Sequence, residues 1–190
     1  MSLVQLMADD DSAELIRSLP DELAESVLTE LHDDHSEGVE QLLGYDEDTA
    51  GGIMSTDVFA LGQELTVKQA IEELQDSEDY EMVFYVYVVD EHNHLVGVLS
   101  LRQLLTVPPS TSLADIMTTD VLRVRTDMDQ EDVAELVAKY NILAIPVVDE
   151  HGKLMGLITV DDVIDVMRDE ATEDILRMAG TSEEELLYGY

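Results

Sequence analysis

Apolar residues recur at helical spacing in the first fifty positions of the chain. Residues three or four apart share one face of an α-helix, and Pro20 and Gly44 stand where such helices begin or end. We therefore predict a short all-α segment over residues 1–50. The positions that define its helices are Leu3 and Leu6; Leu15, Ile16 and Leu19; Leu23, Val27, Leu28 and Leu31; and Val39, Leu42 and Leu43.

After residue 50 the pattern changes to short apolar runs that alternate with amphipathic stretches. Four apolar runs predict two β-hairpins: 83–89 with 95–100, and 144–148 with 154–159. Thr66 and Asp129 are placed to cap a helix before each hairpin, and a further helix is expected after each, from Leu101 and from about Val160. Pro146 has no N–H to donate, so we expect its strand to lie at a sheet edge or to begin at this residue.

One supersecondary unit occurs twice in this region. Ile53–Val58 returns as Ile116–Val121, and Val88–Ser100 returns as Val147–Thr159. Each copy follows the order strand, helix, strand, strand, helix, which predicts an α/β arrangement of a small sheet covered by helices. A unit of this size buries its apolar face by stacking on its copy, and such stacking leaves paired clefts between the two.

The composition is strongly acidic. The chain has 44 Asp and Glu against 9 Lys and Arg, a formal net charge of −35. Nucleic acid is excluded as a partner, because binding to phosphate backbones depends on basic patches. Two interpretations of the acids stay open: solvated carboxylates that keep a salt-adapted protein soluble, and clusters that bind hard divalent cations. Because there is no cysteine and no apolar stretch of about 18 residues, we expect a soluble cytosolic chain.

The last predicted helix separates acidic from apolar residues. At about 100° per residue, one side carries Asp162, Asp165, Asp169 and Glu173, and the other carries Val160, Val163, Ile164, Met167, Ala171 and Ile175. Further acids cluster at 9–11 and 129–132, and acidic faces that meet across a domain interface need cations between them. Mg²⁺ suits such a place, since it takes hard oxygen ligands and keeps several waters. A solvated helix face tolerates the same charges at small cost.

The second copy resembles the core of a CBS domain over Val147–Asp162, and the first copy is similar to its tandem partner. The resemblance implies a CBS pair, or Bateman module, over about 50–174. In CBS pairs an adenine nucleotide such as ATP can lie in the cleft between copies, and the family's motif falls here on Gly156, Thr159 and Asp162. The same Thr-x-x-Asp pattern is also a helix-capping box that needs no ligand.

The whole order of segments resembles the cytosolic part of MgtE-type magnesium channels and transporters. The helical segment, the Ala50–Met54 junction, the CBS pair and Glu170–Ile175 carry this resemblance. It implies a helical N domain at 1–50, CBS domains at 51–112 and 113–174, and the start of a connecting plug helix at 175–190. The implied Mg²⁺ ligands are Asp162, Asp165, Glu170, Glu173, Asp129, Glu131 and Asp11.

Our hypothesis is therefore a Mg²⁺-sensing regulatory region at the cytoplasmic face of the membrane. The resemblance implies a homodimer through the CBS domains and a pore in a transmembrane domain of the same full-length protein. The N domain is shorter than is usual in the family and no membrane span follows, so we expect a fragment. Two alternatives stay open: a soluble adenine-nucleotide sensor that regulates another protein, and a salt-adapted interaction module without a ligand.

The remaining motifs add no catalytic function. The chain has no Gly-x-Ser-x-Gly elbow and no phosphate-binding loop, so we do not expect an enzyme. His32 and His35 are three residues apart, but two ligands do not make a metal site. His92, His94 and His151 fall in the predicted hairpin turns, where we expect solvated side chains.

Overall fold

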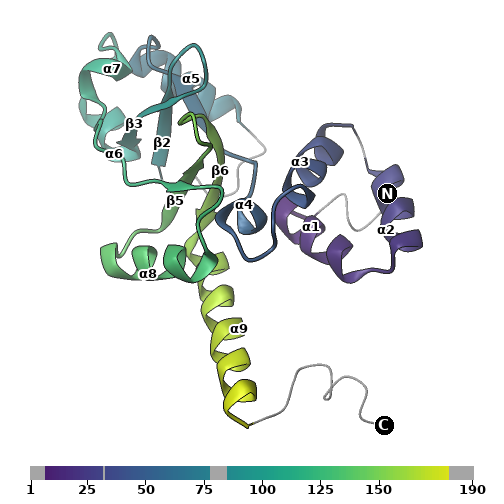
Figure 1. The fold of residues 1–190 in the computed structure, drawn as a ribbon. Coiled ribbons are helices and arrows are strands. Elements are labelled where there is room, and N and C mark those ends of the chain that lie inside the picture. The colour runs from purple at the N-terminus through teal and green to yellow at the C-terminus, as the bar shows by residue number, and fades with distance from the viewer. Residues whose placement is uncertain (1–6, 32, 78–84, 180–190) are drawn as a thin grey trace.

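The computed structural model describes residues 7–31, 33–77 and 85–179. Its first part is an all-α N domain, as predicted, in which α1 (Asp9–Ser18) packs against α2 (Asp21–Glu30) and α3 (Asp33–Leu43) (Figure 1). Pro20 precedes α2 and Gly44 follows α3, so both helix boundaries agree with the sequence pattern. The predicted helical positions Leu3 and Leu6 lie outside the described residues.

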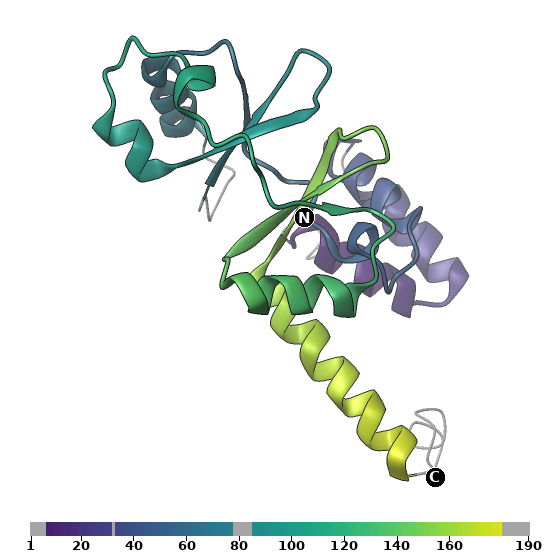
Figure 2. The ribbon, with the colours of Figure 1, turned by 60° about the vertical axis from the view of Figure 1, so that its left-hand side comes forward.

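Two three-stranded sheets follow, one from each copy of the repeat (Figure 2). In each sheet the central strand pairs in parallel with the first strand and antiparallel with the third. Each copy opens with a short helix that the sequence pattern did not predict, and then follows the predicted order of strand, helix, strand, strand, helix. The first copy comprises α4 (Ala50–Ile53), β1 (Ala60–Gly62), α5 (Val67–Asp76), β2 (Tyr85–Val89), β3 (Leu95–Ser100) and α6 (Leu101–Thr106). The second comprises α7 (Leu113–Ile116), β4 (Val124–Arg125), α8 (Gln130–Tyr140), β5 (Ala144–Val148), β6 (Leu154–Thr159) and α9 (Val160–Ala179).

The capping residues occupy their predicted places. The Thr66 side chain accepts from the Gln69 N–H in a capping box at the start of α5, and the Asp129 side chain accepts from the Glu131 N–H at the start of α8. Local hydrogen bonding of this kind satisfies backbone N–H groups that a helix leaves free at its first turn. Both helices therefore begin where the sequence predicts.

Pro146 contradicts its expected position, because it is the third residue of β5, the central strand of its sheet. The equivalent residue of the first copy, Tyr87, donates its N–H to the Phe59 carbonyl at 3.4 Å on the side of the parallel strand. Proline has no such donor, and here the neighbouring strand β4 starts only at Val124, opposite Val147. The sheet accommodates proline by shortening the adjacent parallel strand.

The two copies exchange the segments that open them. Met54, which opens the first copy, is fully buried in the core of the second, and Ser55 forms a two-hydrogen-bond bridge with Leu157 of β6. In return Met117, which opens the second copy, packs in the first copy's core beside Gly97. The repeat in the sequence and the packed unit in space are therefore offset from each other.

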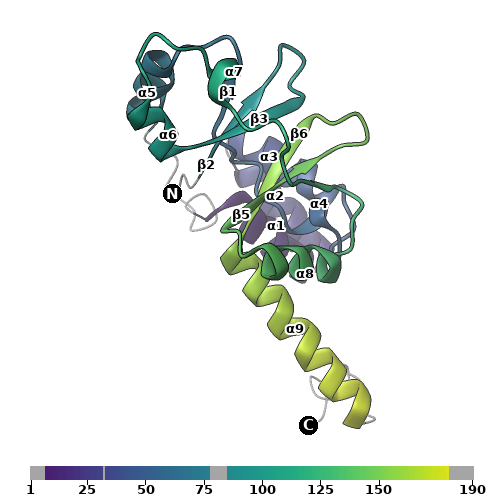
Figure 3. The same cartoon turned by 90° about the vertical axis from the view of Figure 1, so that its left-hand side faces the viewer.

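Helix α9 leaves the body of the protein and extends away from it (Figure 3). Val163 and Val166 are buried in its first two turns. Ile164, Met167 and Ile175, on the apolar side that the sequence pattern predicts, are 51%, 52% and 63% exposed. Most of this apolar side is therefore not buried within the chain, since a helix that projects beyond the domain has nothing to pack against.

The exchange of opening segments predicts that a methyl group added at Gly156 destabilises the protein more than one added at Gly97. A Cβ at Gly156 would lie 2.6 Å from both the Met54 Sδ and the Ser55 carbonyl oxygen, whereas the three nearest atoms to a Cβ at Gly97 all belong to the flexible Met117 side chain. We expect Gly156→Ala to lower the free energy of unfolding by about 1–3 kcal/mol and Gly97→Ala to lower it less. Urea unfolding of both variants measures this, and an equal loss would contradict the account.

Candidate metal-binding interface

Asp9 joins the N domain to the opening segment of the first copy. Its side chain is only 2% exposed. One carboxylate oxygen accepts from the Ser55 hydroxyl at 2.7 Å, and the other accepts from the Thr56 N–H at 2.9 Å and from the Thr56 hydroxyl. The Asp10 N–H donates to the same carboxylate at 3.0 Å. A buried carboxylate is stable only when its oxygens are satisfied, and here they are.

Arg17, about two turns further along α1, makes a second polar connection. Its guanidinium donates to the Leu42 carbonyl at 2.7 Å, the Gly52 carbonyl at 3.1 Å and the Tyr45 carbonyl at 3.2 Å. These acceptors lie at the end of α3, in the loop after it, and in α4. Arg17 therefore fixes the N domain to α4, which itself packs against the second copy.

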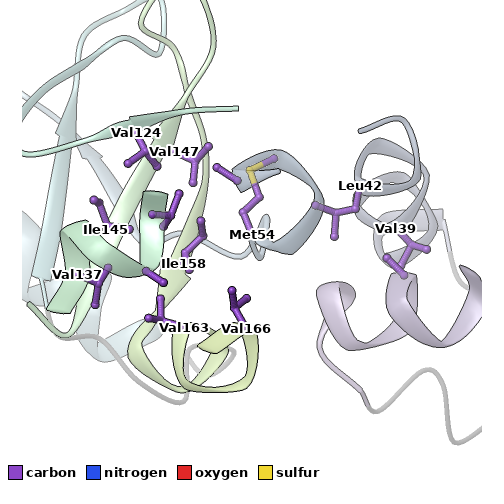
Figure 4. Close-up of a cluster of buried hydrophobic side chains, with 14 of the residues drawn as sticks. Val39, Leu42, Met54, Val124, Val137, Ile145, Val147, Ile158, Val163 and Val166 are labelled. Carbon is purple, nitrogen blue, oxygen red and sulfur yellow. The ribbon is translucent and has the colours of Figure 1, made fainter. Parts of the chain in front are cut away.

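A single hydrophobic cluster continues across the same junction. Met54 lies between the N-domain residues Leu42 and Val39 and the second-copy residues Val147 and Ile158 (Figure 4). All five side chains are fully buried. The N domain is consequently docked on the second copy, by apolar contact as well as by the polar ties of Asp9 and Arg17.

Asp10 stands beside this well-bonded junction without a comparable partner. Its Oδ1 is buried and accepts no hydrogen bond from any group that the structure describes. Burial, together with the negative charges of Asp162 and Asp9, raises the pKa of the Asp10 carboxyl from 3.8 to about 7. An ionised Asp10 is therefore unfavourable at this interface unless a cation accompanies it.

Asp162 faces this region from the first turn of α9. It accepts the Thr159 N–H at 2.9 Å and the Thr159 hydroxyl at 2.6 Å, so it caps its own helix. Burial raises its pKa, as do the charges of Asp161 and Asp11, while the Thr159 bonds lower it. The structure thus brings the predicted ligands Asp162 and Asp11 together and adds Asp10, which the sequence pattern had placed only within an acidic cluster.

A second acidic group lies where α8 begins beside the middle of α9. A hydrogen bond between the Glu131 and Glu170 side chains raises the pKa of Glu131, and the charges of Glu170, Asp129 and Asp174 add to the effect. Gln130 donates to Glu170 at 2.7 Å. Three predicted ligands, Asp129, Glu131 and Glu170, therefore gather here.

The two remaining predicted ligands lie in different surroundings. Asp165 is paired with Arg168 at 3.3 Å and Glu173 with Arg177, and all four side chains are largely exposed. Exposed ion pairs of this kind contribute little to stability, but each of the two carboxylates already has an arginine as its cationic partner. The stripe expected on α9 is consequently divided: Asp162 faces the N domain, Asp165 and Glu173 pair with arginines along the helix, and Asp169 is exposed.

The acidic groups differ from a preformed ion cage. In the described ranges, the residues with three ligand atoms mutually within 4.8 Å are Asp90, His92 and His94, distant in sequence from the acidic interface. The acids at the interface are more widely spaced. Mg²⁺ is suited to this spacing, because it retains several waters and uses only one or two carboxylates per ion.

The residues of the expected nucleotide motif lie at the end of β6 and the start of α9. Gly156 provides the space in which Met54 packs, and the Thr159 hydroxyl is engaged by Asp162. Ser100 and Gln103 form the equivalent capping box in the first copy. The capping role therefore explains Thr159 and Asp162 locally, and Asp162 belongs to both the nucleotide and the metal sets.

Comparison with known proteins agrees with this architecture. Residues 1–48 match the MgtE intracellular N domain, and residues 50–110 and 113–169 each match the CBS domain. The magnesium transporter MgtE of Thermus thermophilus is 47% identical over 79% of this chain and 34% of its own length. The Bacillus subtilis transporter of the same name is 39% identical over 94% of this chain and 40% of its own length.

A solved structure gives the same result. The cytosolic domain of the Mg²⁺ channel MgtE in complex with ATP superimposes with a TM-score of 0.82 at 41% identity, over 86% of this chain and 67% of that one. The fold is thus a tandem CBS pair preceded by a helical N domain. The chain belongs to the MgtE family, and it spans between a third and two fifths of the curated relatives' length. Among the described residues, no helix has the length and apolar composition needed to cross a bilayer.

The raised pKa of Asp10 predicts how stability depends on pH in the absence of metal. The folded protein holds a proton on Asp10 that the unfolded chain releases above pH 3.8. Stability from this group is therefore complete below about pH 4 and is lost as pH rises toward 7, with a slope of up to about 1.4 kcal/mol per pH unit. Asp10→Asn, which cannot ionise, should flatten that slope.

The measurement is chemical unfolding in EDTA across pH 4 to 8 for both proteins, because the difference between them isolates Asp10 from the other acids. Parallel curves would contradict the assignment.

Proposed function

We propose that this chain is a cytosolic regulatory region that senses Mg²⁺ and controls a magnesium pore in a transmembrane domain of the same full-length protein. The observation that carries the proposal is the buried, unpartnered Oδ1 of Asp10 beside Asp162, at the junction of the N domain and the second CBS copy. Family membership supports the choice of ion, since the relatives are magnesium transporters. A regulatory region of this kind is not an enzyme.

The mechanism follows from the two kinds of carboxylate on α1. Asp9 is satisfied by Ser55 and Thr56 and favours docking at all Mg²⁺ concentrations. Asp10, Asp11 and Asp162 oppose docking when they are ionised, because like charges repel across a partly buried interface. Mg²⁺ that bridges them binds the docked state better than the open one, and this difference in affinity shifts the population toward docking.

Helix α9 is the element that transmits the change. Asp162 stands in its first turn, Glu170 faces α8 further along, and the helix continues outward to Ala179. Cations at both acidic groups would fix this single helix against the N domain and α8 together. Undocking would release it, and a connecting helix freed at its base moves the pore to which it leads.

The other members of the predicted ligand set have smaller parts in this proposal. Glu131, Asp129 and Glu170 form the second cation site, with Asp174 added. Asp165 and Glu173, each held by an arginine, contribute general negative charge. We further propose that two chains associate through their CBS domains at the cytoplasmic face of the membrane.

Adenine nucleotide binding is a second function that one observation favours. The related cytosolic domain was solved with ATP, and this chain carries the motif residues Gly156, Thr159 and Asp162. Rotation of the Thr159 hydroxyl away from Asp162 would free both groups to bind a ribose or phosphate. Stabilisation by ATP in EDTA, lost in Thr159→Val, would support this role.

Mg²⁺ should compact the protein and raise its melting temperature at constant ionic strength, because bridging removes the repulsion at the interface. Small-angle scattering and thermal unfolding against MgCl₂, with NaCl lowered to compensate, measure both effects. Asp10→Asn combined with Asp162→Asn should reduce the response severalfold. Asp165→Asn removes a charge of the same sign from α9, one turn away, and should leave the response largely intact.

Two outcomes would contradict the sensor. The first is an equal effect of Na⁺ at matched ionic strength, which would favour a salt-adapted module. The second is an equal loss of response in Asp165→Asn and in the double variant, which would show that total charge matters and the Asp10–Asp162 site does not.

A further inference from the structure

The turn between β2 and β3 gathers two imidazoles and a carboxylate. Asp90, His92 and His94 each offer a ligand atom, and these atoms lie within 4.8 Å of one another. From the sequence we expected solvated turn histidines. The His94 side chain is only 36% exposed and the Asp90 side chain 24% exposed, so neither extends freely into solvent.

Backbone geometry places these side chains together. The Asp90 Oδ1 accepts the N–H groups of both His92 and His94 at 2.9 Å, and Asn93 adopts a left-handed conformation with φ of 64°. This tight turn brings the two rings to a centroid separation of 6.0 Å.

Contacts with the second copy brace the turn from outside. The Leu95 N–H donates to the Gly152 carbonyl at 3.0 Å, the Leu154 N–H donates to the Asn93 carbonyl at 2.9 Å, and the Asn93 side chain donates to the Leu154 carbonyl at 3.1 Å. The ligand-bearing loop is therefore held against the second copy through Asn93 and Leu95. Preorganisation of this kind reduces the entropy lost on binding.

The spacing of the atoms fits a metal ion. The Asp90 Oδ2 and the His94 Nδ1 are paired at 3.0 Å, a few tenths of an ångström short of the roughly 3.3–3.4 Å expected between two ligands that each lie about 2.0–2.1 Å from a tetrahedral ion. A ring nitrogen of His92 lies within 4.8 Å of both and can provide the third ligand. Imidazole nitrogen favours Zn²⁺ and neighbouring transition metals, whereas Mg²⁺ prefers oxygen.

We propose that Asp90, His92 and His94 form a binding site for a divalent transition metal such as Zn²⁺, separate from the acidic Mg²⁺ interface. Water completes the coordination on the exposed side of the turn. A metal in this site links Asp90, directly after β2, to His94, directly before β3, and so stiffens the hairpin that packs on the second copy. The site would let the CBS pair respond to a transition metal separately from Mg²⁺, because the acidic interface offers only oxygen ligands and this turn offers imidazole nitrogen.

The second copy supplies a natural control. Its turn has the same backbone, since Asp149 accepts the N–H groups of His151 and Lys153 at 2.8 Å and Gly152 takes the left-handed position with φ of 87°. Lys153 occupies the position that His94 has in the first copy, and a lysine ammonium has no lone pair to bind a metal. Only the first copy carries the complete ligand set.

The test is calorimetric titration of the intact chain with Zn²⁺ in the presence of saturating Mg²⁺. We expect one Zn²⁺ per chain bound at this site, with the histidine ring signals of His92 and His94 shifting in NMR spectra. His94→Lys, which reproduces the second copy's turn, should weaken binding by more than about tenfold, and Asp90→Asn should also weaken it while keeping the turn. His151→Ala should leave the affinity unchanged.

Three results would overturn the proposal: no Zn²⁺ binding by the unaltered chain, displacement of Zn²⁺ by Mg²⁺, or binding that His94→Lys leaves undiminished. The double variant His32→Gln with His35→Gln guards against a different histidine pair as the source. Loss of the Zn²⁺ signal in that variant, with His94→Lys unaffected, would likewise place the metal elsewhere.

Discussion

The arrangement of this molecule depends on how α1 docks against the start of the CBS pair. Two neighbouring carboxylates meet opposite conditions there: Asp9 is buried and hydrogen-bonded to Ser55 and Thr56, while Asp10 is half-buried and has one buried oxygen that accepts no hydrogen bond from the described part of the chain. Asp9 favours docking of the N domain, whereas Asp10 allows it only when its carboxyl is protonated or accompanied by a cation. Because Asp10 keeps its proton to about pH 7, Asp162 can be ionised nearby, and a cation can later replace that proton.

The fold could be predicted largely from the sequence, because each copy contains local signals for its own helices and strands. Capping residues such as Thr66 and Asp129 fixed the helix starts, and hydrophobic periodicity fixed the strands. Two features could not be predicted, since both depend on tertiary neighbours. Pro146 lies in a central strand because the adjoining strand is short there, and α9 exposes Ile164 and Met167 because it projects beyond the domain.

The candidate site was predicted less completely. Acid clusters and family resemblance located Asp11, Asp162, Glu131 and Glu170 near two interfaces, yet spacing along a helix could not show which acids find an arginine. Asp165 and Glu173 do so, and the sequence signal for this was the presence of Arg168 and Arg177 three and four residues later. Asp10 was missed because three adjacent aspartates look alike in the sequence, and nothing there shows which of them is buried at an interface.

Proton release on Mg²⁺ binding tests the central claim most directly. A cation that takes the place of the Asp10 proton must displace it, so calorimetric titrations with MgCl₂ near pH 7 in buffers of different ionisation enthalpy should report a fraction of a proton released per chain. That release should grow below pH 7, shrink above pH 8, and be absent in Asp10→Asn. Binding without proton release, or the same release in Asp10→Asn, would contradict the account.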